Sequence, residues 1–82
     1  MNDDARMQLF LAQVVRALVA RPDEASVSVM DGRRATRFEI RTVDEDRGQV
    51  IGKDGMTIRA IRTLAAISAH RRRRRFEVEL PG

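Results

Sequence analysis

The sequence has 82 residues and contains no cysteine, tryptophan or tyrosine. Without cysteine, disulfide bonds and thiol chemistry are excluded. The chain also lacks any apolar run near the ~20 residues that a helix needs to cross a bilayer. Asp3 and Asp4 lie in the N-terminal segment, where a signal peptide is basic and then apolar. We therefore expect one cytoplasmic domain with a single modest core and no membrane segment.

The only aromatic residues are Phe10, Phe38 and Phe76. Each falls on the apolar side of a helical or alternating pattern, and we expect all three in the core. The chain then has no exposed aromatic platform on which bases can stack. This argues against the RRM and cold-shock types of nucleic-acid site, which depend on such platforms.

Positive charge is concentrated in one part of the chain. The formal net charge is +4. Residues 1–46 carry 7 basic and 9 acidic side chains, whereas residues 47–75 carry 9 basic side chains and one acidic side chain. The resulting excess of positive charge in the second segment favours a polyanionic partner.

Local patterns predict a helix and a hairpin in the first half. Residues 4–20 carry apolar side chains at helical spacing, namely Met7, Phe10, Leu11, Val14, Val15 and Leu18. Residues 25–30 and 37–41 alternate like two strands, and Asp31-Gly32 between them is a hairpin signal. We interpret Arg33 and Arg34 as solvated turn residues. Among the acids that follow, Asp44 to Asp46, a helix cap at Asp46 is favoured over a divalent-metal site.

The most informative stretch is Gly52-Lys53-Asp54-Gly55, which is flanked by aliphatic residues on both sides. Two glycines three positions apart permit a tight turn whose backbone can approach another molecule closely. A helix that starts near Gly55 directs unpaired N–H groups and the positive end of its dipole at this turn. Such an arrangement suits a phosphate group.

The predicted helix over residues 55–70 is apolar over a wide arc. One ridge consists of Met56, Ala60, Leu64 and Ile67, and a second of Ile58, Ile61, Ala65 and Ala69. Docking on one sheet needs a narrower arc, so part of it is expected to face a ligand groove or another protein. The run Arg71 to Arg75 follows, and residues 76–80 alternate like a last strand. The run is interpreted either as a solvated loop or as a direct contact for a polyanion.

No catalytic constellation is recognisable. The only histidine, His70, lies beside five arginines at a predicted helix end. The segment Gly48 to Asp54 comes nearest to a nucleotide-binding loop. It fails because a Walker A motif needs four residues between its glycines and Ser or Thr after the lysine. We expect a protein that is not an enzyme and that uses no cofactor or metal.

The segment from Val50 to Ile58 resembles the Val-Ile-Gly-x-x-Gly-x-x-Ile signature of the K homology (KH) domain, whose GxxG loop clamps a nucleic-acid backbone. The element order resembles the type II, bacterial form of this domain. That form implies an α+β fold of order α-β-β-α-α-β, with three helices packed on one face of a three-stranded sheet. A single domain over residues 1–82 is implied, with the first helix and hairpin in 4–43, the helix-loop-helix in 46–70 and the last strand in 75–80.

More narrowly, residues 18–24, 46–55 and 60–64 resemble motifs of the small stand-alone KH proteins of the KhpA family. The resemblance implies a cytoplasmic protein that binds single-stranded RNA and acts as an RNA chaperone or post-transcriptional regulator. It also implies a homodimer, and a heterodimer with a larger KH-containing partner linked to cell elongation and cell shape. The alternative that stays open is a protein-interaction module in which RNA binding is secondary.

The expected RNA contacts come from the glycine loop, its flanks and the arginine run. The RNA backbone is expected over the loop and the bases against aliphatic side chains. The assigned residues are Arg47, Val50, Ile51, Gly52, Lys53, Asp54, Gly55, Met56, Ile58, Arg59, Arg62, Arg71, Arg72 and Arg73. Ile58 suits the core equally well. Asp54 places a negative charge in the clamp, which weakens a phosphate contact unless this side chain caps the following helix.

Overall fold

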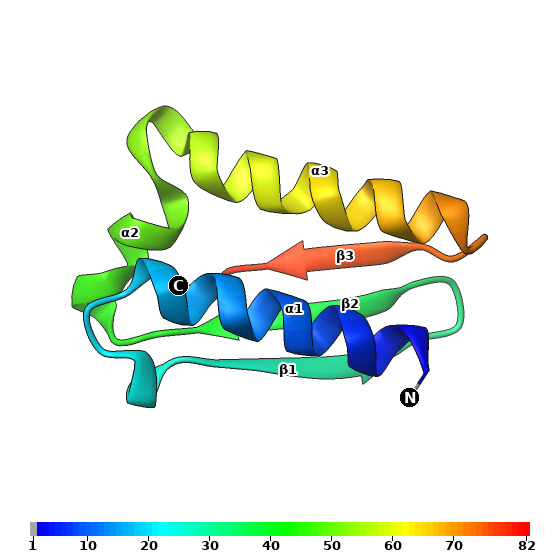
Figure 1. The fold of residues 1–82 in the computed structure, drawn as a ribbon, viewed down its shortest axis with the longest axis horizontal. Coiled ribbons are helices and arrows are strands. Elements are labelled where there is room, and N and C mark those ends of the chain that lie inside the picture. Colours follow the sequence, from blue (N-terminus) through cyan, green and yellow to red (C-terminus); the bar gives the residue numbers. More distant parts are fainter. Residues whose placement is uncertain (1) are drawn as a thin grey trace.

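Figure 1 shows the computed structural model of the chain, which describes residues 2–82. The main elements are α1 (Asp3–Leu18), β1 (Ser26–Asp31), β2 (Thr36–Arg41), α2 (Arg47–Ile51), α3 (Met56–Arg71) and β3 (Phe76–Glu79). Within the described chain, single turns of 3-10 helix at Pro22–Glu24, Asp44–Asp46 and Lys53–Gly55 lie between these elements. The predicted α+β fold of order α-β-β-α-α-β is confirmed.

The three strands form one mixed sheet in the order β1-β2-β3. β1 and β2 are antiparallel, and Val29 pairs with Phe38. β3 returns to the other side of β2 and runs parallel to it, with Thr36 opposite Phe76. The helices α1 and α3 lie across the same face of this sheet (Figure 1). β2 is therefore the central strand. The parallel strands β2 and β3 begin at the same end of the sheet.

The core lies between this face of the sheet and the two long helices. Its most completely buried side chains are those of Leu11, Val15, Phe38, Ile40 and Val50. The rings of Phe38 and Phe76 meet edge to face, with their centroids 5.2 Å apart. Burial of each large side chain contributes about 1.5–3 kcal/mol, so these residues account for much of the stabilising free energy.

α1 begins where local chemistry allows a helix to begin. The side chain of Asn2 accepts a hydrogen bond of 2.8 Å from the Ala5 N–H, and Asp3 and Asp4 occupy the first turn. Both features satisfy the positive end of the helix dipole. The prediction for Phe10 was wrong, because this side chain is 41% exposed. Met7, Leu11 and Val15 already fill the stripe that faces the sheet, and Phe10 lies beside it, toward α3.

Two other local predictions require correction. Asp31 belongs to β1 and pairs with Thr36, so the hairpin loop spans residues 32–35 and is not a two-residue Asp-Gly turn. The Gly32 N–H donates to the Ala35 carbonyl at 3.0 Å across this loop. Asp46 precedes α2 but does not cap it with its side chain. Its carboxylate is buried and accepts a hydrogen bond of 3.0 Å from the Arg21 N–H instead.

Candidate nucleic-acid interface

The glycine loop connects α2 and α3 at one end of the molecule (Figure 1). Gly52 ends α2 with φ 76° and ψ 173°, and Gly55 precedes α3 with φ 74° and ψ 14°. A hydrogen bond of 3.1 Å from the Gly55 N–H to the Gly52 carbonyl closes the turn. Lys53 and Asp54 are the first two residues of this turn. Their N–H groups therefore have no acceptor carbonyl within the turn itself.

Gly52 is required by its backbone conformation and by its neighbours. Its positive φ is rare for residues with a side chain. A Cβ at this position would meet the Thr57 side chain and would lie 2.9 Å from the Thr57 backbone nitrogen. The first turn of α3 therefore passes directly over Gly52, and the loop stays narrow for that reason.

Asp54 adopts a left-handed conformation with φ 55°, which Asp tolerates better than most residues. Its carbonyl accepts a hydrogen bond of 3.1 Å from Arg59 Nη2, so this arginine lies along the outer side of the loop. No side chain caps the start of α3, where Gly55 is the N-cap. The Asp54 carboxylate is thus not turned away to cap the helix, and its negative charge remains at the exposed loop.

The aliphatic residues around the loop divide into supporting and exposed positions. Val50 is completely buried and Ile58 is also buried, so both hold the loop from beneath. Ile51 is half-buried. Met56 is 62% exposed and offers the largest apolar surface beside the loop. Of the four aliphatic residues assigned to RNA, only Ile51 and Met56 present side-chain surface at this end.

Arg47 and Arg62, which we also assigned to RNA, are tied to the C-terminal part of the chain. Arg47 Nη2 donates to the Leu80 carbonyl at 3.2 Å. Arg62 Nε donates to the Val78 carbonyl at 3.0 Å, which positions its guanidinium over β3. Arg62 also lines a shallow cavity of about 440 Å³ between α3 and β3. This cavity lies farther along α3 from the loop, and Glu77 and Glu79 also line it.

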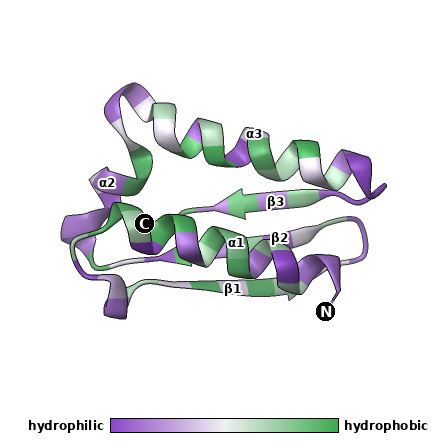
Figure 2. Cartoon of the chain, viewed as in Figure 1, coloured by the Kyte–Doolittle hydropathy of each residue, from purple (hydrophilic) through white to green (hydrophobic). Residues whose placement is uncertain are grey.

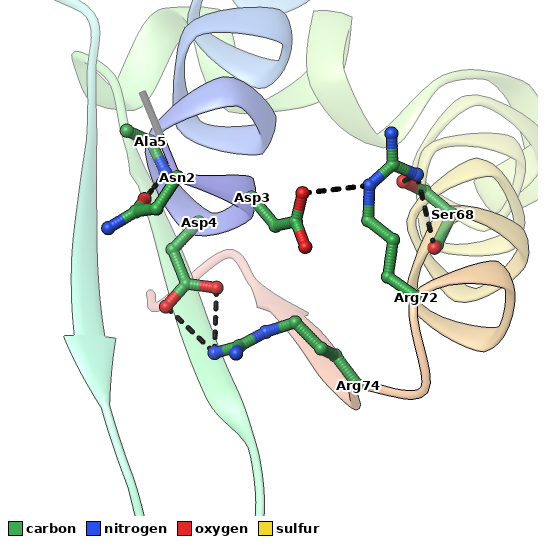
Figure 3. A network of polar contacts seen from close by, with 7 residues as sticks. All are labelled: Asn2, Asp3, Asp4, Ala5, Ser68, Arg72 and Arg74. Atoms are coloured by element: carbon green, nitrogen blue, oxygen red, sulfur yellow. Dashed lines mark hydrogen bonds and ion pairs between the residues drawn. The ribbon is translucent and has the colours of Figure 1, made fainter.

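The arginine run lies at the other end of α3 from the glycine loop (Figure 1). A helix of 16 residues separates the two sites by about 24 Å. Figure 3 shows that two arginines of the run bind the first turn of α1. Arg72 Nε donates to Asp3 Oδ1 at 3.0 Å, and Arg74 Nη2 donates to Asp4 Oδ2 at 3.0 Å. The structure therefore does not bring the run and the loop together.

The ridge of α3 that consists of Met56, Ala60, Leu64 and Ile67 has no partner among the described residues, whereas the ridge of Ile58, Ile61, Ala65 and Ala69 is buried in the core. Leu64 is 50% and Ile67 54% exposed, in line with Met56 at the start of the helix. Figure 2 shows hydrophobic residues in successive turns of α3, interrupted by hydrophilic ones, and a hydrophilic C-terminal end. Leu64 and Phe10 line a cavity of about 270 Å³ between α3 and α1. Sequence periodicity predicted this excess of apolar surface, although it placed Phe10 in the core.

Neither a metal site nor a membrane span is found in the described part of the chain. The acids Asp44 to Asp46 do not form a group of three or more side chains that could hold a metal ion within residues 2–82. No helix there combines the length and the apolarity needed to cross a membrane.

The order of helices and strands, together with the GxxG turn between α2 and α3, is that of a single KH domain. The family model described as "KhpA/KhpB, KH domain" matches residues 8–80. The chain belongs to this KhpA/KhpB family of KH-domain proteins.

Several curated relatives carry the name "RNA-binding protein KhpA". The protein from Treponema pallidum is 41% identical over 70 residues, covering 85% of this chain and 88% of the relative. That from Chlamydia pneumoniae is 38% identical over 74 residues, covering 90% and 95%. That from Clostridium acetobutylicum is 36% identical over 74 residues, covering 90% and 99%. No solved structure matches the chain significantly.

Proposed function

We propose that this protein is a non-catalytic, cytoplasmic RNA-binding module that holds single-stranded RNA at the glycine loop. Membership of a family whose relatives are named RNA-binding proteins supports the proposal. The observation that carries it is the conformation of Gly52 and Gly55, which leaves the backbone of the turn open to a phosphate. Lys53 is exposed at the tip and adds a positive charge.

In this proposal, the RNA backbone crosses residues 52–55 and the bases lie along α3. Arg59 contacts the backbone beside the loop, while Ile51 and Met56 contact the first bases. The bases then follow the cavity between α3 and β3, where Arg62 lies. Val50 and Ile58 support the loop without touching RNA, because both are buried. A four-nucleotide segment is what a GxxG loop clamps, so sequence preference is modest.

The role of the loop is tested by reversing the charge of Lys53. Lys53→Glu is expected to lower the affinity for a short unstructured RNA at least tenfold. Arg16→Glu is the matched control, because it makes the same change of charge at an exposed position beside β1, away from α3. Fluorescence anisotropy at fixed salt measures both affinities, and circular dichroism checks the fold. Equal affinities of Lys53→Glu and the parent would remove the clamp from the proposal.

A role as RNA chaperone or post-transcriptional regulator follows if the bound RNA is held without fixed sequence. Such a protein favours single-stranded RNA over duplex, because its groove takes unpaired bases. An annealing assay with two complementary labelled RNAs tests this role. Wild-type protein is expected to change the rate of annealing, and Lys53→Glu is expected to lose that effect.

A second candidate function is pairing with another protein, and the exposed apolar ridge of α3 favours it. Met56, Leu64 and Ile67 present more apolar surface than an isolated monomer needs. We propose that the ridge forms a homodimer, with a larger KH-containing protein as the alternative partner. Leu64→Glu is expected to shift sedimentation toward the monomer. Ala66→Glu, on the opposite side of the same helix, is expected to leave association unchanged.

A further inference from the structure

Two arginine-rich loops lie side by side at the end of the sheet farthest from the glycine loop. One is the β1–β2 hairpin loop with Arg33 and Arg34, and the other is the α3–β3 connection with Arg73 and Arg75. They lie together because β2 and β3 are parallel neighbours, so the loops that lead into these two strands are at the same end of the sheet. The Thr36 N–H donates to the Arg75 carbonyl at 2.9 Å and fixes one loop beside the other.

The arginines of the run alternate between two environments. Arg72 and Arg74 turn toward α1 and pair with Asp3 and Asp4 (Figure 3). Arg73 has a left-handed backbone and forms no ion pair among the described residues. The Arg75 side chain is 73% exposed, and its nearest acid is Glu77 at 4.0 Å. The paired arginines hold the connection in place while Arg73 and Arg75 keep their charge available.

A cavity of about 190 Å³ lies between the two loops. Its lining includes Arg33, Arg34, Arg73, Arg74 and Arg75 and, within the described chain, no acidic residue. Arg74 pairs with Asp4 at 2.9 Å and Arg75 lies 4.0 Å from Glu77, while Arg33, Arg34 and Arg73 form no ion pair among the described residues. A cluster of this kind attracts anions strongly, because like charges at short range raise the local potential.

We propose that this cavity is a second RNA-binding site, which holds the phosphodiester backbone of a segment other than the one at the glycine loop. The proposal rests on the proposed function, since it adds a second contact to the same ligand. Arginine suits it because its planar guanidinium donates two parallel hydrogen bonds to phosphate oxygens. About 24 Å lies between the sites along α3, so an RNA that fills only the loop does not reach the cavity.

The length of the RNA distinguishes binding at the glycine loop from binding at the arginine-lined cavity. An oligonucleotide of about 4 nucleotides occupies only the loop, whereas one of about 20 nucleotides is long enough to reach both sites. Arg33→Gln with Arg34→Gln is expected to leave binding of the short RNA unchanged and to weaken binding of the long RNA at least fivefold. Because this double variant no longer neutralises two phosphates, the slope of log affinity against log salt falls by about 1.4 for the long RNA.

The control removes the same two charges elsewhere. Arg16→Gln with Arg41→Gln alters exposed arginines that do not line the cavity, and it is expected to leave the slope for the long RNA unchanged. Equal slopes for the two double variants would overturn the proposal in favour of a general effect of net charge. So would a loss of affinity for the short RNA that matches the loss for the long RNA.

A second variant approaches the cavity from the other loop. Arg73→Asn with Arg75→Gln keeps at position 73 a residue that tolerates a positive φ. It is expected to reproduce the loss for the long RNA, and wild-type affinity in a folded variant would overturn the proposal. Inorganic tripolyphosphate is the third arm. Competition by tripolyphosphate that equals competition by RNA at matched phosphate concentration would overturn the assignment to RNA.

The two proposals fail separately. If Lys53→Glu leaves the short RNA bound but the arginine variants still weaken the long RNA, the clamp is wrong and the cavity stands. If Lys53→Glu abolishes short-RNA binding and the arginine variants match their control, the clamp stands and the cavity is wrong.

Discussion

Arg74 Nη2 lies 2.9 Å from Oδ1 and 3.0 Å from Oδ2 of Asp4, so the connection before β3 is bound to the first turn of α1. The same amino group donates to the Thr36 hydroxyl at 3.2 Å, and this hydroxyl donates to Asp4. Thr36 is buried, and the two charged side chains satisfy its polar atom. Asp4 therefore holds together α1, β2 and the chain that enters β3.

Asp4→Asn removes the charge of this contact and keeps its shape. We expect a loss of about 1 kcal/mol in the free energy of unfolding, because the pair is partly exposed and screened by water. For a domain of this size that loss corresponds to about 4–8 °C in Tm. Urea denaturation measures it, with Asp23→Asn as a control at an exposed position. The difference should shrink in ~1 M salt, and a loss that persists there would contradict an electrostatic origin.

Gly52→Ala and Gly48→Ala should have opposite effects. Alanine at Gly52 is forced to a positive φ and toward Thr57, which costs about 2 kcal/mol or more. Gly48 lies inside α2, and a Cβ there meets no atom within 4 Å. Alanine at that position should stabilise the protein by about 0.5–1 kcal/mol. Thermal denaturation of both variants measures the effects, and similar Tm values would show that the loop is not restricted as the structure indicates.

Asp54→Asn should strengthen RNA binding. Asn tolerates the left-handed backbone as Asp does, so the loop keeps its conformation. Removal of one negative charge about 4 Å from a phosphate is worth about 1 kcal/mol in water, or roughly fivefold in affinity. Anisotropy with a short RNA measures this gain, again against Asp23→Asn. Weaker binding by Asp54→Asn would mean that the carboxylate itself accepts a hydrogen bond from the RNA.

Asp46→Ala should destabilise the domain by about 1–3 kcal/mol. The Arg21 N–H would lose its acceptor at a partly buried site, and an unsatisfied donor carries a desolvation cost. Asp46→Asn keeps an oxygen at the same place and should recover most of the loss. Denaturation curves of the two variants give the comparison. Equal destabilisation by both would assign the effect to the charge and not to the hydrogen bond.

The sequence predicted those features that depend on neighbouring residues. Helical spacing located α1 and α3, and the two glycines located the loop, because these signals act within a few turns of chain. The prediction for Phe10 failed because periodicity gives the apolar side of a helix but not how much of it a three-stranded sheet can cover. The local signals were also insufficient at Asp46, whose acceptor role depends on Arg21, 25 residues earlier.

The site was predicted less completely than the fold. Charge counts placed the glycine loop and the arginine run in one basic segment, residues 47–75, and did not say how far apart the two lie. The distance between the loop and the run follows from the length of α3, which spans 16 residues in the structure. Arg33 and Arg34 were interpreted as solvated turn residues because nothing in the hairpin itself points to Arg73 or Arg75. Only the parallel pairing of β2 with β3 brings these arginines together.

That pairing also determines when the protein can fold during its synthesis. β2 is complete at Arg41, but it acquires its second neighbour only when β3 has been made, and Phe76 and Val78 complete the core. Parallel pairing between strands so distant in sequence needs a large loop to close before the new interactions compensate for the entropy cost. The sheet is therefore complete only once residues 76–79 have been synthesised, and a chain that stops before Phe76 leaves one side of β2 without its neighbour.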